Sequence, residues 1–433
     1  MKQIVVVGGG MCGLFLLYQI TKQNLPWQVV LLEKEVRLGG RVKTVDGMEA
    51  GAGRFQKYHF LFQQLISELG LRHLATPTDS TAVFYPSDGT NFFMDSVLDY
   101  RTNHENVLEP AFFAALDVYL GKKTLPCSGL VTEIVLASKF YDKKYLQNTC
   151  LDTFAKKIIG KKNTDFIKES FGFYTELVTM NAWDACRLFL SLNPSNEFFV
   201  LRGGLSQVTD AMVAVIQKNS NIQILLKHAV IGIEKDKNLF DITCENGLRI
   251  KTETCICATE KEVLEKLSIF RPIRSMLQKI ECGSLCRIYS VYSNHWFRGI
   301  SKFTTNNDLR MVIPFNKKIL MTSYSDNHFA DSWKRLYDSY GEDGVEKKIK
   351  KLLKQSLGME IPTPQKTMVF YWKCGVGYWM VGADSHVYAE KIQNPMPNLF
   401  VCGENVSENH QQWMEGALET GMQVLETIKN ELQ

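Results

Sequence analysis

The sequence predicts an α/β protein built around a parallel sheet, with a second α+β domain interleaved with the first. Two observations predict this class. Strands and helices alternate through the first eighty residues, and the same alternation returns after residue 200 and again at the C-terminus. The stretches between them are irregular, which indicates a different domain. A chain of 433 residues also exceeds the usual size of a single core and favours two or three domains.

The N-terminal segment has the pattern of a strand, helix and strand. Ile4–Val7 is an apolar run that predicts a buried strand, Met11–Gln23 predicts a helix, and Val29–Leu32 predicts a second strand parallel to the first. A further helix is predicted from Tyr58 to Leu69, because its leucines recur at helical spacing. Gly70 follows as a suitable left-handed cap.

The middle of the chain changes character and then returns to alternation. Residues 80–195 are mostly helical, irregular and rich in Phe and Tyr, which indicates a separate domain. Strand patterns resume at Ile222–Leu226. The runs Leu239–Cys244 and Leu248–Thr252 flank Asn246-Gly247, and Asn-Gly between two strands is a strong signal for a hairpin.

The C-terminal segment supplies one more strand, turn and helix. Leu399–Gly403 predicts the strand and turn, and a helix is expected from about Met414. Each of the two domains is therefore visited more than once by the chain. We expect residues 1–78, 196–272 and 385–433 to form one domain and residues 79–195 and 273–384 to form the other.

Composition argues against nucleic-acid and membrane partners. The 50 Lys and Arg residues nearly balance 46 Asp and Glu residues, and a formal net charge of +4 gives no broad field for an anionic polymer or surface. No apolar run reaches membrane-spanning length. The N-terminus begins directly with a predicted strand and lacks the pattern of a signal peptide, so we expect a cytoplasmic location.

The cysteines predict neither a disulfide framework nor a metal site. Their number, eleven, is odd, they are scattered, and they contain no CxxC pair. We therefore expect reduced thiols in the core, in a reducing compartment. Cys282 and Cys286 are assigned to core packing because no nearby His completes a metal-ligand set with them, and we expect no bound metal.

A glycine motif directly after the first strand predicts a dinucleotide site. In Gly8-x-Gly10-x-x-Gly13, the first glycine permits a tight turn, the second a close approach to a pyrophosphate, and the third close packing of helix on strand. Phosphates would meet free N–H groups at the helix N-terminus. Glu33 follows Gly13 by twenty residues and can accept hydrogen bonds from ribose hydroxyls. The motif predicts a Rossmann-like domain, without separating NAD from FAD.

A second glycine-rich loop favours FAD. It lies immediately after Glu33 and comprises Arg37, Gly39, Gly40 and Arg41, and the nearby stretch Glu49–Phe55 adds Ala52, Gly53 and Arg54. Paired glycines permit another close approach to a diphosphate, and the arginines can pair with its charge. A nicotinamide enzyme does not require this second loop, so we expect these residues to contact FAD rather than form a plain basic turn.

These motifs resemble the flavin-containing amine oxidase family, which includes monoamine and polyamine oxidases, L-amino-acid oxidases and flavin-dependent histone lysine demethylases. The Arg37–Arg41 pattern resembles theirs in full. The resemblance extends to Gly203-Gly204 at the start of a helix and to Ala258-Thr259 at a strand end. It also covers Val230, which matches a position whose backbone contacts the adenine in the family.

The C-terminal motif is the most specific part of the resemblance. Gly403-Glu404 and Trp413-Met414 have the family's order, and Trp413 lies ten positions after Gly403, as in the family. The resemblance implies that Gly403 and Glu404 lie beside the phosphates and the ribityl chain. It also implies that the helix from near Met414 directs its positive end toward the flavin pyrimidine and stabilises the anion formed on reduction.

The sequence departs from the family at the positions of the covalent link and of the aromatic cage. Family members with a covalent flavin carry a cysteine in a segment that follows the position of Trp372. In this sequence the matching residues are Gly382-Ala383-Asp384, without a cysteine, and Trp372 itself is a predicted FAD contact. We therefore expect noncovalent FAD. The two aromatic residues that face each other in the family would correspond to Asp384 and Trp413, so half of the cage is absent.

A further departure concerns the flavin-facing lysine of the family. The segment Ile280–Phe297 resembles the strand that carries this lysine, which holds a water against flavin N5, but here the position is Arg287. A buried lysine can lose its proton, whereas a guanidinium stays charged, so the two residues cannot do the same acid–base work. Arg287 can hold a water, stabilise reduced flavin or clamp a carboxylate; the alternative is an arginine on the surface or in a salt bridge.

The resemblance implies an FAD-dependent oxidase of a small-molecule amine or amino acid. Hydride would pass from the carbon bearing a neutral amine to flavin N5, the imine would hydrolyse, and O2 would reoxidise the flavin to give H2O2. Arg287, Trp413 and Asp384 are the predicted catalytic residues, in a site expected between the domains over the flavin face.

The departures leave two alternatives open. The first is dehydrogenation or desaturation of a larger non-amine substrate, as in porphyrinogen-oxidising enzymes. The second is a flavin-binding interaction protein that has lost turnover. The oligomeric state is not predicted.

Overall fold

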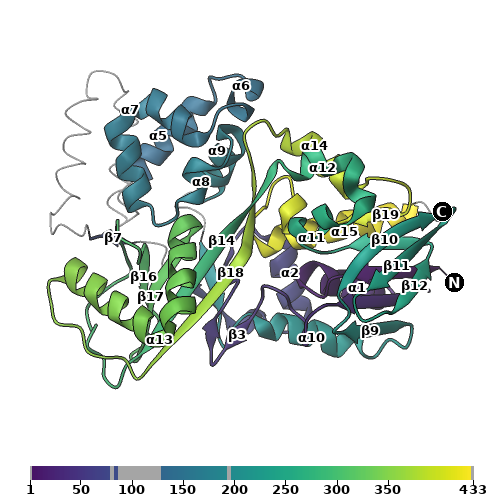
Figure 1. Cartoon of the computed structure of the whole chain (residues 1–433), viewed down its shortest axis with the longest axis horizontal. Coiled ribbons are helices and arrows are strands. Elements are labelled where there is room, and N and C mark those ends of the chain that lie inside the picture. The colour runs from purple at the N-terminus through teal and green to yellow at the C-terminus, as the bar shows by residue number, and fades with distance from the viewer. Residues whose placement is uncertain (1, 79–81, 86–127, 193–196, 431–433) are drawn as a thin grey trace. The chain divides into compact units, whose positions relative to one another are not determined.

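The computed structural model describes residues 2–78, 82–85, 128–192 and 197–430 (Figure 1). The chain forms two compact units, each assembled from separate stretches. The first contains Met1–Thr78, Asn196–Cys282 and Cys374–Gln433, and the second contains Asp79–Ser195 and Gly283–Lys373. Residues 86–127, which fall in the predicted second domain, lie outside the described part of the chain.

A five-stranded parallel sheet forms the centre of the first unit, with the order β19-β13-β1-β2-β9. Its strands are β1 (Gln3–Val7), β2 (Gln28–Glu33), β9 (Ile222–Leu226), β13 (Thr254–Cys257) and β19 (Leu399–Val401). Ile4 and Val6 belong to one core while Val5 and Val7 belong to another, as the alternation of a strand covered on both faces requires. Because β1 is the middle strand, the loop that follows it opens at the centre of the sheet's carboxyl edge.

Helices cover one face of this sheet. They are α1 (Met11–Lys22), α10 (Ser206–Ile216) and α15 (Met414–Asn430), with α2 (Phe60–Glu68) beside them. α1 contacts both α10 and α15, and every residue from Met11 to Ile20 is buried. This burial explains why α1 is apolar on all sides rather than amphipathic.

The other face is covered by a three-stranded antiparallel sheet and short helices. Its strands are β10 (Val230–Asp236), β11 (Leu239–Cys244) and β12 (Arg249–Thr252), and the hairpin predicted around Asn246-Gly247 is confirmed by the pairing of β11 with β12. The remaining elements of the unit are β3 (Thr44–Val45), β4 (Met48–Glu49), β5 (Phe55–Gln56), β6 (Ala75–Thr78), β8 (Phe198–Leu201), α11 (Lys261–Lys266), α12 (Arg274–Leu277), α14 (Ser385–Gln393), η1 (Arg72–Leu74), η2 (Ser268–Ile273) and η3 (Glu404–Val406).

The second unit is organised by a six-stranded sheet with the order β18-β14-β17-β16-β15-β7. Its strands are β7 (Val83–Phe84), β14 (Ile280–Val291), β15 (Phe303–Thr304), β16 (Met311–Pro314), β17 (Ile319–Asp326) and β18 (Lys366–Trp379). The first residues of β14 and the last residues of β18 belong to the first unit. Trp333 is fully buried in the core beneath this sheet and donates its indole hydrogen to the Asp308 carbonyl at 2.7 Å.

The other described elements of the second unit are helices. They are α5 (Ser128–Ser138), α6 (Lys143–Gln147), α7 (Leu151–Ser170), α8 (Thr175–Val178), α9 (Ala182–Ser191) and α13 (Asn327–Leu357). α7 and α13 are each interrupted by a glycine with positive φ, Gly160 and Gly341. These breaks suit the one residue type that takes this conformation without strain.

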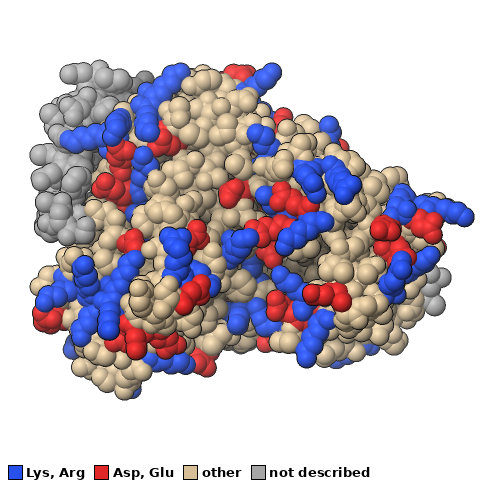
Figure 2. Space-filling model, in the orientation of Figure 1, with Lys and Arg blue, Asp and Glu red and all other residues tan. Residues whose placement is uncertain are grey.

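The surface carries both signs of charge. Lys and Arg side chains are interspersed with Asp and Glu over the face drawn in Figure 2. This mixture agrees with the small net charge of the sequence, +4. Within the described residues, no helix combines the length and the apolar character that crossing a membrane requires. No group of three or more His, Cys, Asp or Glu side chains is placed to hold a metal ion in the part of the chain the structure describes.

Candidate functional site

The turn after β1 shows what each of its glycines does. A Cβ at Gly8, whose φ is +106°, would lie 2.4 Å from the Ala258 carbonyl oxygen, and one at Gly13 would lie 2.0 Å from the Gly8 oxygen. At both positions the protein's own backbone leaves no room for a side chain, so only glycine fits. Gly10 differs, because its Cβ would meet nothing nearer than a backbone atom of Gly40 at 4.0 Å. Protein packing does not require a glycine there, which leaves the close approach of a ligand as its reason.

Two groups at this turn are suited to a dinucleotide. Gly10 begins α1 without a side-chain cap, so the first N–H groups of the helix are available to an anion. Glu33 ends β2 and is buried; its two oxygens accept hydrogen bonds from Gly9 N–H at 2.7 Å and Glu35 N–H at 2.8 Å. These backbone donors fix the carboxylate, which retains lone pairs for further donors such as ribose hydroxyls.

The Arg37–Arg41 loop is joined directly to that turn. Gly39 N–H donates to the Gly9 carbonyl at 2.8 Å. Arg37 donates to carbonyls of its own loop, namely those of Leu38 at 2.9 Å, Val42 at 3.3 Å and Gly40. Arg37 therefore fixes the loop's shape through its hydrogen bonds, and Arg41 is the arginine of the pair that reaches other segments.

Glu404 connects three segments of the first unit. It is 6% exposed and immediately follows Gly403. Four donors contact its carboxylate: Arg41 Nη1 at 2.6 Å, Asn405 Nδ2 at 2.5 Å, Gln412 N–H at 2.8 Å and Gly377 N–H at 3.2 Å. Arg41 Nη1 also donates to the Gly375 carbonyl at 2.8 Å. The Arg37–Arg41 loop, the end of β18 and the residues before α15 are thereby held together. We call Gly8–Gly13, Arg37–Arg41 and Glu404 the cofactor cradle.

Trp413 lies among aromatic rings and a guanidinium. Its ring centroid is 4.9 Å from that of His59 and 6.1 Å from that of Phe198. The Arg54 guanidinium lies 4.5 Å above the Phe198 ring and 5.8 Å from the Trp413 ring. Trp413 Nε1 is buried and has no hydrogen-bond acceptor among the described residues. A buried donor without an acceptor is costly, which indicates that a ligand completes this position.

His59 is a neutral residue beside Trp413. Burial, with a smaller contribution from the neighbouring His410, lowers its pKa to about 3. Its Nδ1 accepts the Gln56 N–H at 3.2 Å, so the ring carries its proton on Nε2. Neither sequence motif included this histidine. His59 is held in place by a turn, because its N–H also donates to the Gln56 carbonyl at 3.1 Å.

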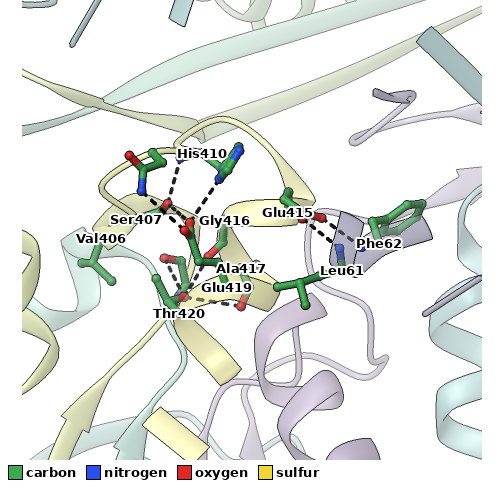
Figure 3. A network of polar contacts seen from close by, with 12 residues as sticks. Leu61, Phe62, Val406, Ser407, His410, Glu415, Gly416, Ala417, Glu419 and Thr420 are labelled. Carbon is green, nitrogen blue, oxygen red and sulfur yellow. Dashed lines mark hydrogen bonds and ion pairs between the residues drawn. The ribbon is translucent and has the colours of Figure 1, made fainter. Parts of the chain in front are cut away.

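A hydrogen-bonded network surrounds the start of α15 (Figure 3). His410 Nδ1 lies 3.2 Å from Glu419 Oε2, and Ser407 Oγ donates to the same oxygen at 2.9 Å. Burial raises the pKa of Glu419, but these hydrogen bonds outweigh it and leave the pKa below its usual range. Glu415 accepts the Leu61 and Phe62 N–H groups at 2.9 Å each, and so caps α2. The network holds the segment around Trp413 to α2.

Arg287 lies in β14 of the second unit and is buried, with 7% of its surface exposed. Its guanidinium lies 4.3 Å above the ring of Tyr324, its partner residue in β17. Phe173 packs edge-on against the same tyrosine at 4.9 Å. The alternative that Arg287 is a surface arginine is therefore wrong; it is a buried cation stacked on an aromatic ring.

The prediction that the cysteines are all reduced is wrong for two of them. Cys282 and Cys374, 92 residues apart in the sequence, form a disulfide. The other eight described cysteines are free. Sequence spacing gave no sign of this bond, because it depends on β14 and β18 being neighbours in a sheet. The remaining free thiols are buried apart from the half-buried Cys150, as expected for core residues.

Comparison with known proteins identifies the fold and the family. A family model described as flavin-containing amine oxidoreductase matches residues 11–427. The chain belongs to this family. A protein named "Probable flavin-containing monoamine oxidase A" from Dictyostelium discoideum is 20% identical over 464 residues, covering 99% of this chain and 98% of that one. The sequence prediction of a flavin-type α/β fold and of this family is confirmed.

Two porphyrinogen-oxidase comparisons add to this picture. The coproporphyrinogen III oxidase of Bacillus subtilis (strain 168) is 37% identical over 81 residues, which is 17% of this chain and 17% of that enzyme. A crystal structure from Exiguobacterium sp. 255-15, named "Putative protoporphyrinogen oxidase", superposes with a TM-score of 0.69 over 99% of both chains at 15% identity. At that identity the superposition shows the fold alone.

Membership of the flavin-containing amine oxidoreductase family implies a flavin cofactor, and the residues present fit one. The open face of Gly10 and the uncapped start of α1 are both explained by a bound dinucleotide. The other predicted contacts lie in several elements. Ala52 and Gly53 follow the Arg37–Arg41 loop in the sequence, and Val230 begins β10. Trp372 is half-buried in β18, and Met414 is buried at the start of α15.

Asp384, predicted as the second cage position of this flavoprotein, has a local structural role. It is the N-cap of α14, and its Oδ1 accepts the Val387 N–H at 3.5 Å. Its part in catalysis stays a prediction. Trp413 is instead surrounded by His59 and Phe198, which the sequence did not indicate, and by Arg54, which was predicted as an FAD contact.

Proposed function

We propose that the chain is an oxidase that binds FAD noncovalently and oxidises an amino acid or a related carboxylate-bearing amine, with O2 as the electron acceptor. FAD, when bound, accepts hydride from the substrate and returns the electrons to O2. The observation that carries the choice of substrate is the Arg54 guanidinium, stacked 4.5 Å above Phe198 and 5.8 Å from Trp413. The family and the cofactor cradle support the flavin chemistry.

The cradle residues would hold the dinucleotide in separate ways. The N–H groups at the start of α1 would meet the pyrophosphate, Glu33 would accept from a ribose, and Val230 would contact the adenine through its backbone. Arg41 and Glu404 would line the phosphate and ribityl region. Binding would be noncovalent because Gly382-Ala383-Asp384 stands where covalent members carry a cysteine.

Arg54 favours a substrate with a carboxylate over a simple amine or polyamine. A guanidinium remains charged at every accessible pH and offers parallel N–H donors that match the two oxygens of a carboxylate. Stacking on the Phe198 ring fixes the plane of the Arg54 guanidinium and so the direction of these N–H donors. The same cation disfavours a polyamine by like-charge repulsion, which gives the site selectivity as well as affinity. The unpartnered Trp413 Nε1–H adds a second donor in the same cluster.

Peroxide release from a panel of substrates tests this proposal. We expect H2O2 from at least one L-amino acid with purified, FAD-loaded protein, and little from monoamines or polyamines. Arg54→Ala should raise KM for the active amino acid by roughly a hundredfold, the loss expected for a charge-assisted hydrogen-bonded pair. The variant should retain FAD, measured by absorbance after gel filtration. If Arg54→Ala loses FAD instead, Arg54 is the cofactor contact that the sequence analysis expected.

A second candidate is dehydrogenation of a carboxylate-bearing porphyrinogen. The local match to a coproporphyrinogen III oxidase favours it, and a cationic Arg54 also suits propionate groups. Anaerobic bleaching of the bound flavin by a porphyrinogen, with no bleaching by amino acids, would select this candidate. A bound flavin that no donor reduces would instead favour a binding role without turnover, and in that case Arg287→Lys should not restore activity.

A further inference from the structure

The Cys282–Cys374 disulfide lies next to residues that hold the cofactor cradle. Cys282 is the third residue of β14 and Cys374 lies in the second half of β18, and both belong to the first unit. Cys374 is 5% exposed, whereas Cys282 is half-buried. Cys282 is thus the more exposed of the two cysteines, and we expect a dissolved thiol to attack the bond at its sulfur.

The residues directly after Cys374 make two of the contacts that close the cradle. The Gly375 carbonyl accepts Arg41 Nη1 at 2.8 Å, and Gly377 N–H donates to Glu404 Oε2 at 3.2 Å. A Cβ at Gly377 would lie 2.9 Å from the backbone of Asn405, so the strand is pressed against the Glu404–Asn405 segment. This segment of β18, Arg41 and Glu404 thus hold one another in place.

β18 is a hydrogen-bonded neighbour of β14 in the six-stranded sheet, and two further bonds join this end of β18 to the residues around the start of β14. Met380 N–H donates to the Lys279 carbonyl at 2.9 Å, and Lys279 Nζ donates to the Val381 carbonyl at 2.9 Å. These bonds survive reduction of the disulfide. Reduction should therefore loosen the Gly375–Gly377 segment without unfolding it.

We infer that the Cys282–Cys374 pair is a reversible thiol modification site whose redox state sets how tightly the cradle holds FAD. The inference rests on the proposed flavin function. In the oxidised state the cross-link holds Gly375 and Gly377 against Arg41 and Glu404. In the reduced state the segment moves more freely, and the cradle pays the entropy of ordering it when FAD binds.

A thiol is the reductant that opens the Cys282–Cys374 disulfide, and a peroxide is the oxidant that re-forms it. In the first step of reduction, a thiolate attacks Cys282 Sγ, the S–S bond breaks, and Cys374 Sγ leaves with the electron pair and takes a proton. In the second step, another thiol attacks the mixed disulfide, which releases Cys282 as a free thiol and leaves the reductant as a disulfide. In the reverse direction, the Cys282 thiolate attacks a peroxide oxygen to give a sulfenic acid and, after proton uptake, water. The Cys374 thiol then displaces a second water and re-forms the disulfide. H2O2, the product of the proposed oxidase, is a peroxide of this class.

The test measures FAD affinity of the full-length protein in each redox state, by flavin absorbance retained after gel filtration and by titration of the apoprotein. We expect treatment with a phosphine reductant to weaken FAD binding by roughly tenfold. Cys282→Ser should bind FAD as weakly as the reduced protein and should not respond to the reductant. Cys150→Ser, which removes a half-buried free thiol of the second unit, is the matched control and should behave as the wild type.

The outcomes are distinct. Equal FAD affinity in the oxidised and reduced protein would overturn the inference while leaving the proposed function intact. Alkylation of both Cys282 and Cys374 in unreduced native protein, detected by peptide mapping, would also overturn it. If neither redox state binds FAD, the proposed function fails and the inference fails with it. Should Cys282→Ser fold poorly, the reversible change in the wild-type protein, with re-oxidation by dilute H2O2, decides the question.

Discussion

The turn after β1 and the end of β18 both contribute backbone groups around the cofactor cradle, but they are positioned in different ways. The turn is shaped within six residues, because a Cβ at Gly13 would lie 2.0 Å from the Gly8 carbonyl oxygen. The Gly375–Gly377 segment is placed by Arg41, by Glu404 and by a disulfide to Cys282. Local steric closure leaves the turn one conformation, whereas the strand segment depends on tertiary contacts that a substitution or a reductant can remove.

The largest effect is expected from Gly13→Ala, because the new methyl group would meet backbone that cannot move away. We expect a loss of about 5 kcal/mol or more of unfolding free energy, at the exceptional end for a point substitution. Gly10→Ala is the matched control in the same turn. Its methyl group would face open space, with the nearest protein atom 4.0 Å away.

Chemical unfolding and FAD titration separate the two glycine variants. Gly10→Ala should keep wild-type stability as apoprotein while its FAD affinity falls at least about tenfold, or roughly 1.4 kcal/mol. Wild-type FAD affinity in Gly10→Ala would contradict the placement of the dinucleotide at this turn. Wild-type stability in Gly13→Ala would contradict the steric account of the turn.

The second prediction concerns the cross-link that fixes the other region. Removing a disulfide that closes a loop of 92 residues should lower the unfolding free energy by about 4 kcal/mol, chiefly through the greater freedom of the unfolded chain. Denaturant unfolding of Cys282→Ser and of the wild type should therefore differ in oxidising buffer and coincide in reducing buffer. A difference that persists after reduction would show that the serine disturbs packing rather than removing a cross-link.

The third prediction uses pH to probe the aromatic cluster beside the cradle. His59 has a pKa of about 3 in the folded protein and about 6.5 when unfolded, so between these values the unfolded chain binds the extra proton. Stability contributed by the neutral ring is complete above about pH 6.5 and is lost as the pH falls. From pH 7 to pH 5 this loss amounts to about 2 kcal/mol.

Unfolding free energies of His59→Asn measured at both pH values check this prediction. The variant should lose about 2 kcal/mol less than the wild type on acidification. A substitution of the half-buried His228 by Asn provides the control and should leave the wild-type difference in place. If His59→Asn shows the full wild-type loss, His59 is not the group that takes up the proton.

The comparison of the two regions also explains which parts were predictable from sequence. The strand Ile4–Val7, the helix after Met11 and the hairpin at Asn246-Gly247 are encoded by residues adjacent in the chain, and the structure has them within one or two residues of the predicted bounds. The hydrogen bond from Arg41 to Gly375 joins residues 334 positions apart. No local pattern records such a pairing, and for the same reason the disulfide was not predicted.

The residues of the candidate site divide in the same way. The glycines of the cradle and Glu33 could be selected because the physical tasks of a dinucleotide site require them at fixed spacing, whereas Glu404 was selected because its motif resembles that of the family. His59 gave no such signal, since a lone histidine after an irregular turn is recognisable only once Trp413 is seen 4.9 Å away. The contact between His59 and Trp413 arises from tertiary packing, and the spacing of residues in the sequence does not reveal it.

The smallest expected effect distinguishes a cap from a catalytic group just beyond β18. Asp384 was predicted to occupy a cage position, yet it caps α14 through a 3.5 Å hydrogen bond to Val387 N–H. Asp384→Ala should therefore cost about 0.5–1 kcal/mol of unfolding free energy, and Asp384→Asn, which keeps a capping oxygen, should cost less. If the cap is its whole role, kcat/KM for the active substrate is unchanged in both variants. A loss of kcat in Asp384→Asn at wild-type stability would instead return Asp384 to the catalytic group, because only the charge would have been removed.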